Sequence, residues 1–388
     1  MKWQVVELGD VAVVDRRTAA PDEILPGTKY VGLEHIRSGG GFITVPVVSV
    51  GDIASAKFKF THEHVLFGKL RPYLAKIEAP SFEGVCSTDI LPVLPGASLD
   101  KRYLLHYLRQ PAIVDLATTR SSGANLPRLN PKELEKFLIP LPPLAEQRRI
   151  AAILDHADAL RAKRREAIAR LDELAIAVFQ DTIGDLSSYE VTQLSELAQV
   201  SSGLTKGRRL SNDAVTRSVP YLAVVNVQDR RFELSQPKVI DATEQEIERY
   251  RLQEGDLLLT EGGDPDKLGR GSVWRNELPE AIHQNHIFKV RCSTRDVSPT
   301  YLNWVISGGY GKSYFLRSAK QTTGIASINS TQLKAFPVPV APRSLQERFE
   351  ARLATVSAAR NTAQASASAL DLLFVSLQSR AFRGELPA

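Results

Sequence analysis

The chain is poor in cysteine and has no long apolar run. Its 388 residues include two cysteines, Cys86 and Cys292, which are too few for a disulfide framework and show no CxxC spacing. Such cysteine usage is typical of a reducing compartment. No stretch approaches 18 apolar residues, and Glu7 and Asp10 occupy the place where a signal peptide needs an apolar core. We therefore expect a cytoplasmic protein without a membrane span.

Signatures of catalysis and of metal binding are also missing from the sequence. The segment SGGYGKS has Ile306 where a phosphate-binding loop needs its first glycine. The glycine-rich segment at 261–271 is not GxGxxG, and no Asn/Asp-Pro-Pro-aromatic loop of a methyltransferase is present. The pairs His62/His64 and His283/His286 have no cysteine or carboxylate at a known ligand spacing. We therefore predict no catalytic residue, no metal and no cofactor in this chain.

The overall charge mildly favours an anionic partner. The chain has 49 lysines and arginines against 44 acidic residues, a net charge of +5 with a pI of about 9.1. This excess suits nucleic acid but does not prove it. The length predicts two or three domains of ordinary globular composition.

One passage of the sequence occurs twice. LEKFLIPLPPLAEQRRI at 134–150 aligns with LKAFPVPVAPRSLQERF at 333–349, with six identities in 17 positions and no gap. The identical pairs are Leu134/Leu333, Phe137/Phe336, Pro140/Pro339, Pro143/Pro342, Gln147/Gln346 and Arg149/Arg348. The match continues outward, for example at Tyr30/Tyr221 and Tyr103/Tyr301. We infer two copies of one unit, split near residue 187.

Each copy is predicted to consist of a globular domain and a long helix. Short β-type runs, turns and a few helical patches indicate mixed α/β (α+β) globular domains. A stretch without Gly or Pro follows each, with apolar residues at 4-3 spacing, and predicts two long helices that pack antiparallel as a coiled coil. Two separate surface helices are the alternative. The predicted organisation is a first domain at 1–143, a helix at 144–186, a second domain at 187–342 and a helix at 343–388.

The prolines of the repeated passage predict a stiff joint between each domain and its helix. Proline lacks a donor N–H group and favours extended chain, and a helix can begin just after the last proline. Such a joint would fix how each globular domain is held on its helix.

Basic loops of both copies carry side chains suited to DNA. Arginine reads guanine edges, Asn and Gln read adenine, and Lys, Ser and Thr hold phosphates. A solvated surface is the alternative for each loop. The predicted DNA-binding residues are Lys69, Arg71, Tyr73, Lys76, Arg120, Ser121, Ser122, Asn125, Arg128, Lys206, Arg208, Arg209, Gln228, Arg230, Arg231, Lys267, Arg270, Lys320, Gln321, Thr322 and Asn329.

The whole arrangement resembles the specificity subunit of type I restriction-modification systems. The family's Pro-Pro-Leu-x-Glu-Gln-x-x-Ile junction is present as Pro142, Pro143, Leu144, Glu146, Gln147 and Ile150. The second copy departs from it, with Arg343 after Pro342 and Leu345 in place of the glutamate, but keeps Gln346. The C-terminal LQSRAFRGEL is also similar to the family's usual ending.

This resemblance implies a non-catalytic DNA-binding subunit. Each target-recognition domain would read one half of a bipartite, asymmetric site in double-stranded DNA, and the helices would set the gap between the halves. The implied partners are two modification (methyltransferase) subunits and the restriction (ATP-dependent translocase and nuclease) subunits, which would carry S-adenosylmethionine, ATP and Mg. The implied contact surface for the modification subunits contains Arg148, Arg149, Lys163, Arg164, Arg165 and Glu166.

Two other functions remain open from the residues alone. A coiled-coil scaffold with ligand- or protein-binding heads would have the same two helices. Only a DNA-binding subunit would bind duplex DNA with an affinity that falls steeply as the salt concentration rises. A fused nuclease or methyltransferase would need a catalytic domain, for which no residues are left over. The target sequence and the gap length depend on loop geometry, which the sequence does not specify.

Overall fold

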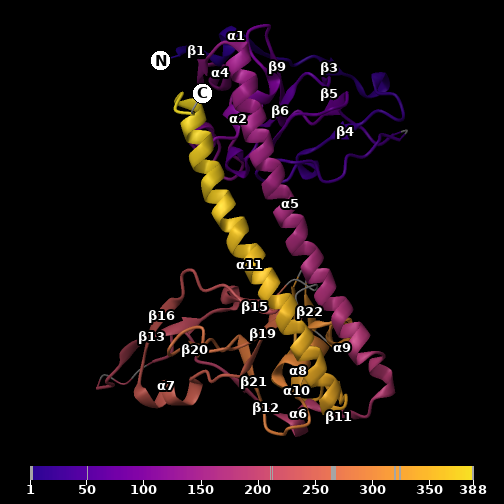
Figure 1. Ribbon diagram of the computed structural model, residues 1–388, viewed down its shortest axis with the longest axis vertical. Helices are drawn as coiled ribbons and strands as arrows, with labels where there is room; N and C mark the ends of the chain where they lie inside the picture. The colour runs from indigo at the N-terminus through magenta and orange to yellow at the C-terminus, as the bar shows by residue number, and fades with distance from the viewer. Residues whose placement is uncertain are drawn as a thin grey trace. The chain divides into compact units, whose positions relative to one another are not determined.

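The computed structural model divides the chain into two compact units. It describes residues 3–49, 51–209, 211, 213–263, 268–318, 320–322 and 325–386, with the backbone alone at 320–322 and 325. Unit 1 comprises Met1–Ile168 and Ala363–Ala388, and unit 2 comprises Ala169–Thr362. Each unit contains one globular head and parts of the two long helices, α5 (Leu144–Ile183) and α11 (Arg343–Phe382) (Figure 1).

The head of unit 1 contains two four-stranded sheets. The first has the antiparallel order β2 (Ala12–Val14), β9 (Ile90–Pro95), β6 (Val65–Gly68), β7 (Ile77–Glu78). The second has the order β3 (Thr18–Ala19), β5 (Lys57–Phe60), β8 (Gly84–Cys86), β4 (Tyr30–Val31), with β4 parallel to β8. The helical elements are α1 (Leu8–Val11), α2 (Lys101–Leu108), α3 (Pro111–Thr119), α4 (Pro131–Glu135), and the 3-10 turns η1 (Pro21–Glu23), η2 (Leu33–His35) and η3 (Pro72–Leu74).

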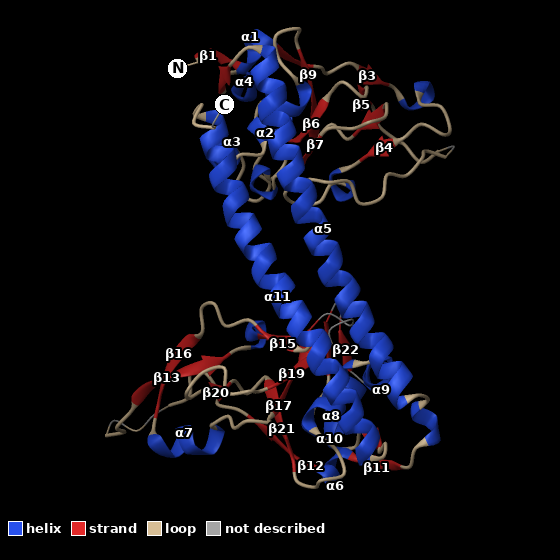
Figure 2. Ribbon diagram, in the orientation of Figure 1, coloured by secondary structure: helices blue, strands red, loops and turns tan. Residues whose placement is uncertain are grey.

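The head of unit 2 repeats this plan with local changes. Its first sheet has the order β12 (Ala198–Ser202), β21 (Ile287–Cys292), β17 (Leu257–Thr260), β19 (Gly271–Val273), and its second β16 (Lys238–Ala242), β13 (Arg217–Leu222), β20 (Ile282–His283). The smaller sheets are β14 (Val227–Gln228) with β15 (Arg231–Phe232), and β18 (Gly262–Gly263) with β23 (Ile325–Ser327) and β22 (Lys320–Thr322). The helical elements are α6 (Leu194–Leu197), α7 (Glu244–Tyr250), α8 (Pro299–Ser307), α9 (Gly309–Ser318), α10 (Ser330–Lys334), η4 (Leu186–Ser188) and η5 (Val224–Asn226) (Figure 2).

Equivalent helices begin with equivalent capping residues. The Asp100 side chain accepts from backbone N–H groups at the start of α2, and Ser298 does the same for α8. Asn130 caps α4 and its counterpart Asn329 caps α10. The caps satisfy N–H groups that a helix leaves unpaired, so they fix where each helix starts. The mixed α/β fold of the heads and their internal repeat are confirmed.

The repeated residues form the centre of each core. Leu134, Phe137, Tyr103 and Ile150 are fully buried in unit 1, and so are their counterparts in unit 2. Those counterparts are Leu333, Phe336, Tyr301 and Phe349. Burial of aromatic and aliphatic side chains of this size is the main favourable term in folding. The repeat in the sequence is thus a repeat of core positions.

The two long helices pair antiparallel within each unit. In unit 1, Arg161 Nε donates to Asp371 Oδ1 at 2.6 Å, and in unit 2 the equivalent Arg360 Nε donates to Asp172 Oδ1 at 2.6 Å. Arg352 also donates to Thr182 at 2.7 Å, so residue numbers run in opposite directions along the two helices. The prediction of an antiparallel pair is confirmed, and the alternative of two separate surface helices is wrong. Both helices start at the predicted residues, 144 and 343, while the proposed domain boundaries stay a prediction.

Candidate nucleic-acid interface

A buried glutamine fastens α5 to the head of unit 1. The Asp100 N–H donates to Gln147 Oε1 at 2.8 Å, and Gln147 Nε2 donates to the carbonyl oxygens of Ser98 at 2.9 Å and Pro142 at 2.8 Å. Gln147 is fully buried, so these bonds do not compete with water. The side chain therefore ties the start of the helix both to the turn before α2 and to the proline segment.

The same fastening occurs in unit 2. The Ser298 N–H donates to Gln346 Oε1 at 2.9 Å, and Gln346 Nε2 donates to the carbonyls of Asp296 at 2.7 Å and Ala341 at 2.8 Å. Gln346 is also fully buried. The predicted stiff joint therefore has a defined atomic basis, which accounts for the presence of the glutamine in both copies.

A tyrosine adds a second bond to each joint. The Tyr103 hydroxyl donates to the carbonyl of Pro140 at 2.8 Å, and the Tyr301 hydroxyl donates to the carbonyl of Pro339 at 2.7 Å. Pro140 lies in β10 (Leu138–Leu141), which pairs with β1 (Gln4–Glu7), and Pro339 lies in β24 (Pro337–Pro339), which pairs with β11 (Val191–Gln193). The chain before each helix is thus a paired strand.

In unit 1 the fold brings two predicted DNA-binding segments together. The Arg71 N–H donates to the Pro127 carbonyl at 2.8 Å, and the Leu129 N–H donates to the Lys69 carbonyl at 2.9 Å. Arg71 has a left-handed backbone, with φ of 51°, and this residue opens the turn η3. Tyr73 in that turn is 53% exposed. Segments some 50 residues apart in sequence therefore share one surface.

Several predicted side chains on this surface already have partners. Arg128 Nε donates to Asp89 Oδ1 at 3.0 Å, and Arg120 pairs with Glu133 at 3.3 Å. Lys76 Nζ donates to the Leu33 carbonyl at 2.6 Å and the Ser121 hydroxyl donates to Ala117 at 2.7 Å. The predicted residues that are exposed here are Arg71, Tyr73, Arg120, Ser122, Asn125 and Arg128, while Lys69, Lys76 and Ser121 are half-buried.

In unit 2 a carboxylate neutralises one of the three predicted DNA-binding residues at 206–209. Arg208 donates to Glu246 Oε2 at 2.6 Å, and hydrogen bonding from Arg208 lowers the pKa of Glu246 to about 2. Lys206 and Arg209 beside it are exposed. Asn329 accepts from the N–H of Gln332 as the cap of α10, so its side chain has a structural role. These contacts leave the predicted DNA roles a prediction.

The same backbone positions carry different charges in the two heads. The Lys69 N–H donates to the Asp89 carbonyl, and its counterpart, the Glu261 N–H, donates to the His286 carbonyl. At this place unit 1 has the Arg128–Asp89 pair, whereas unit 2 has His286 Nδ1 at 2.5 Å from Glu261 Oε2. Equivalent backbone positions therefore present dissimilar side chains in the two heads.

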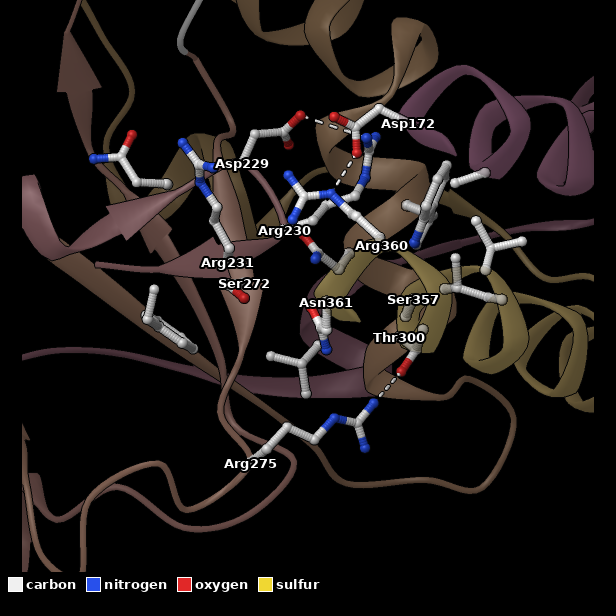
Figure 3. A pocket seen from close by; sticks show the side chains of 18 of the residues that line it. Asp172, Asp229, Arg230, Arg231, Ser272, Arg275, Thr300, Ser357, Arg360 and Asn361 are labelled. Atoms are coloured by element: carbon white, nitrogen blue, oxygen red, sulfur yellow. Dashed lines mark hydrogen bonds and ion pairs between the residues drawn. The ribbon is translucent and has the colours of Figure 1, made fainter. Parts of the chain in front are cut away.

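Four further predicted residues meet at a pocket of unit 2. Gln228, Arg230, Arg231 and Arg270 line it together with Arg360 and other residues of α5 and α11. Arg230, Arg231 and Arg360 are labelled in Figure 3. Sequence reasoning missed the other lining residues that carry charge or an aromatic ring, because they come from elements far apart in the chain. They are Asp172, Asp229, Phe232, Arg275, Glu277 and Trp304. Lys267 lies outside the described residues, and of Lys320, Gln321 and Thr322 the structure describes strand β22 alone.

The histidines considered as metal ligands have other contacts. His64 is buried with Nε2 at 3.2 Å from Asp15 Oδ2, and burial lowers its pKa. Burial also lowers the pKa of His283 to about 3. Among the described residues, no group of three or more His, Cys, Asp or Glu is arranged to hold a metal ion. Within the same residues, no helix combines the length and apolar character that crossing a bilayer needs.

Comparison with known proteins agrees with this geometry. Residues 1–170 match the model of the type I restriction modification DNA specificity domain. The EcoDI specificity subunit of Escherichia coli is 28% identical over 181 residues, which cover 45% of this chain and 40% of that protein. The StySPI specificity subunit of Salmonella potsdam is 23% identical over 315 residues, covering 76% and 67%.

Solved structures extend the likeness in fold to nearly the whole chain. The S subunit of a type I restriction-modification system from M. genitalium covers 98% of this chain and 96% of its own length, with a TM-score of 0.54 at 12% identity. A chain from a structure of the type I R-M system covers 99% and 98%, with a TM-score of 0.57 at 19% identity. The resemblance to specificity subunits inferred from the sequence is confirmed.

Proposed function

We propose that this chain is the DNA specificity subunit of a type I restriction-modification complex that reads a bipartite, asymmetric site. One observation carries the proposal: two heads are fastened to antiparallel helices by the same buried glutamine, yet their outer loops differ. Identical joints support a fixed spacing, and different loops support two different half-sites. The family match over 1–170 supports DNA as the partner.

Each head would read its half-site from the loop surface described above. In unit 1 the exposed Arg71, Tyr73 and Asn125 are the side chains best suited to contact bases or phosphates. In unit 2 the exposed Lys206 and Arg209, together with Glu261, would have this role. Positive groups would position the duplex, and the differing polar groups would select its sequence.

The subunit would recruit catalysis rather than perform it. Methylation with S-adenosylmethionine and cleavage with ATP and Mg would belong to modification and restriction subunits. The relatives' names, which describe specificity subunits, support this division. The alternative, a scaffold whose heads bind proteins or small ligands, predicts no preference for duplex DNA.

Exposed apolar residues support the docking of two copies of one partner. Leu174 and Ile176 on α5 in unit 2 are 47% and 45% exposed. Their repeat counterparts on α11 in unit 1, Leu373 and Val375, are 61% and 48% exposed. Exposed apolar side chains at equivalent places suit a protein contact. The charged flank predicted from the sequence, Arg148 to Glu166, would border the contact, with Arg149 held by Glu146 at 2.7 Å.

The decisive experiment uses the chain assembled with its modification subunits. We expect binding to pooled duplex DNA to weaken steeply with salt, because phosphate contacts release counterions. Arg71→Gln combined with Tyr73→Ala should relax one half-site by about 1–3 kcal/mol. Lys206→Gln combined with Arg209→Gln should affect only the other half, as sequencing of methylated adenines would reveal. A flat salt dependence, or a change in both halves from one head, would refute the assignment.

The spacing role has its own test. Insertion of one helical turn within 160–175 of α5, with a matching insertion in α11, should change the tolerated gap while both half-sites stay the same. Altered half-sites with an unchanged gap would contradict the role of the helices as a spacer.

A further inference from the structure

Unit 2 contains a basic pocket whose lining includes four of the residues predicted to bind DNA. It has a volume of about 790 Å³ and is lined by the loop carrying Arg230 and Arg231, by β19 and α8, and by parts of α5 and α11 (Figure 3). A cavity of this size is typical of small-molecule sites. Its ionisable side chains are five arginines and three carboxylates: Arg230, Arg231, Arg270, Arg275, Arg360, Asp172, Asp229 and Glu277.

The pocket has more positive charge than its own carboxylates compensate. Asp172 is held by Arg360 at 2.6 Å, and Asp229 lies 3.4 Å from Arg230. Arg270 donates to the neutral amide of Gln228 at 3.1 Å, and Arg275 donates to Thr300 at 2.9 Å. Within the described part of the chain, no carboxylate lies at ion-pair distance from Arg231, Arg270 or Arg275. Their charges point to an anionic ligand.

Buried polar atoms in the pocket wall have no partner. Asn303 is 4% exposed and its Oδ1 accepts no hydrogen bond among the described residues. The Nε atoms of Arg230 and Arg270 are likewise buried and unpaired. Arg230 also has a left-handed backbone, φ 55°, and its guanidinium lies 3.8 Å from the centre of the Trp304 ring. Unpaired buried groups and backbone strain cost free energy, and both concentrate where ligands bind.

Unit 1 shows that the fold itself does not require this pocket. Strand register makes Glu78 of β7 the counterpart of Ser272, and the Glu78 carboxylate binds Arg109 at 2.6 Å. The counterpart of Asn303 is Leu105, which is fully buried. At these two positions unit 1 therefore has a carboxylate compensated by an arginine and an apolar side chain, whereas unit 2 has a serine and an amide oxygen without a partner among the described residues.

The walls combine these arginines with an apolar surface. The apolar part of the lining includes Leu171 and Ala175 of α5, Leu353 and Val356 of α11, and Phe232. A ligand that satisfies both sides has a phosphate group and a flat or apolar group. We propose that this pocket binds a small phosphate ester of mononucleotide size, through Arg231, Arg270 and Arg275. The phosphate could come from a free nucleotide or from a DNA strand, and we infer the free nucleotide because the apolar wall matches a base.

The test measures binding of AMP to the full chain by calorimetry at constant ionic strength. Adenosine and inorganic phosphate are measured separately, as the two parts of the AMP molecule. We expect saturable AMP binding, a matching rise in the melting temperature, and weaker binding of both fragments. Arg275→Gln should weaken AMP by about tenfold or more, because one charge-assisted hydrogen bond is lost. Ser272→Glu, which places in unit 2 the carboxylate that Glu78 supplies in unit 1, should abolish AMP binding. Arg295→Gln, which removes an exposed charge of unit 2 outside the pocket, is the matched control.

Two results would overturn the proposal: no saturable AMP binding by the parent chain, or equal loss of AMP binding in Arg275→Gln and Arg295→Gln. If the parent chain binds no AMP and Ser272→Glu loses binding to duplex DNA, the arginines belong to the DNA surface instead. Normal melting of Ser272→Glu would exclude misfolding as the cause of a loss.

Discussion

The two units share their interior and differ on their outside. Gln147 and Gln346 make the same three hydrogen bonds. By contrast, unit 1 has strand β5 paired with β8, whereas unit 2 pairs β16 with β13 and then forms helix α7. Core and joint positions are constrained by close packing, while loop positions are constrained only by what they contact. The difference teaches that the shared part fixes how each head is held on its helix, whereas the variable part sets which side chains each head presents.

The charged interior of unit 1 offers the largest test of this comparison. Arg109 and Glu78 form a pair with both side chains 12% exposed, while the counterpart of Glu78 in unit 2 is Ser272. Arg109→Met should destabilise unit 1 by about 3–5 kcal/mol, because Glu78 is left buried without a cation. Urea unfolding would measure it. The double variant with Glu78→Met should recover most of the loss, and failure to recover would contradict the explanation.

The glutamine joints should give a somewhat smaller and symmetric effect. Gln147→Leu leaves one N–H and two carbonyls unpaired, so we expect a loss of about 2–3 kcal/mol in unit 1, and the same in unit 2 for Gln346→Leu. Thermal unfolding followed by calorimetry would resolve the affected transition. Gln364→Leu, at an exposed position of α11, is the control. Unequal losses from the two joints would break the claimed equivalence.

Acid should affect unit 1 through a residue that unit 2 lacks. The Arg17 guanidinium, which donates to Asp15 Oδ2 at 2.6 Å, lowers the pKa of Asp15 to about 2 although burial opposes it. Since the folded pKa lies below the unfolded value, this stabilisation is present above about pH 4 and is lost as pH falls toward 2. We expect about 1–2 kcal/mol of pH-dependent stability. Asp15→Asn should remove that dependence in urea unfolding at pH 6 and pH 3.

The helix ion pairs should give the smallest effect. Arg161→Met and Arg360→Met remove equivalent bridges whose acids are 53% exposed, so each should cost about 0.5 kcal/mol. Arg161 also lies 4.3 Å from the centre of the Phe374 ring. Arg161→Met should therefore lower the free energy of unfolding by a few tenths of a kcal/mol more than Arg360→Met does. Chemical denaturation at low and high salt would separate the two contributions.

The sequence predicted the parts of the fold that depend on local pattern. Proline spacing, the absence of helix breakers and the 4-3 apolar positions indicated both helices and their start residues. It did not predict the proximity of Arg71 to Pro127, the caps formed by Asn130 and Asn329, or the pocket around Arg230. Those features depend on contacts between distant segments, and no local periodicity encodes them.

The sequence alone determined that this protein is a tandem repeat of a globular head and a long helix. The two copies have diverged, but their core and proline positions are still recognisably alike. Only the tertiary structure decided which loop residues share a surface, which arginines are neutralised and which are not. The physical reason is that burial, hydrogen-bond geometry and charge compensation are properties of neighbours in space, whereas a sequence records neighbours along the chain.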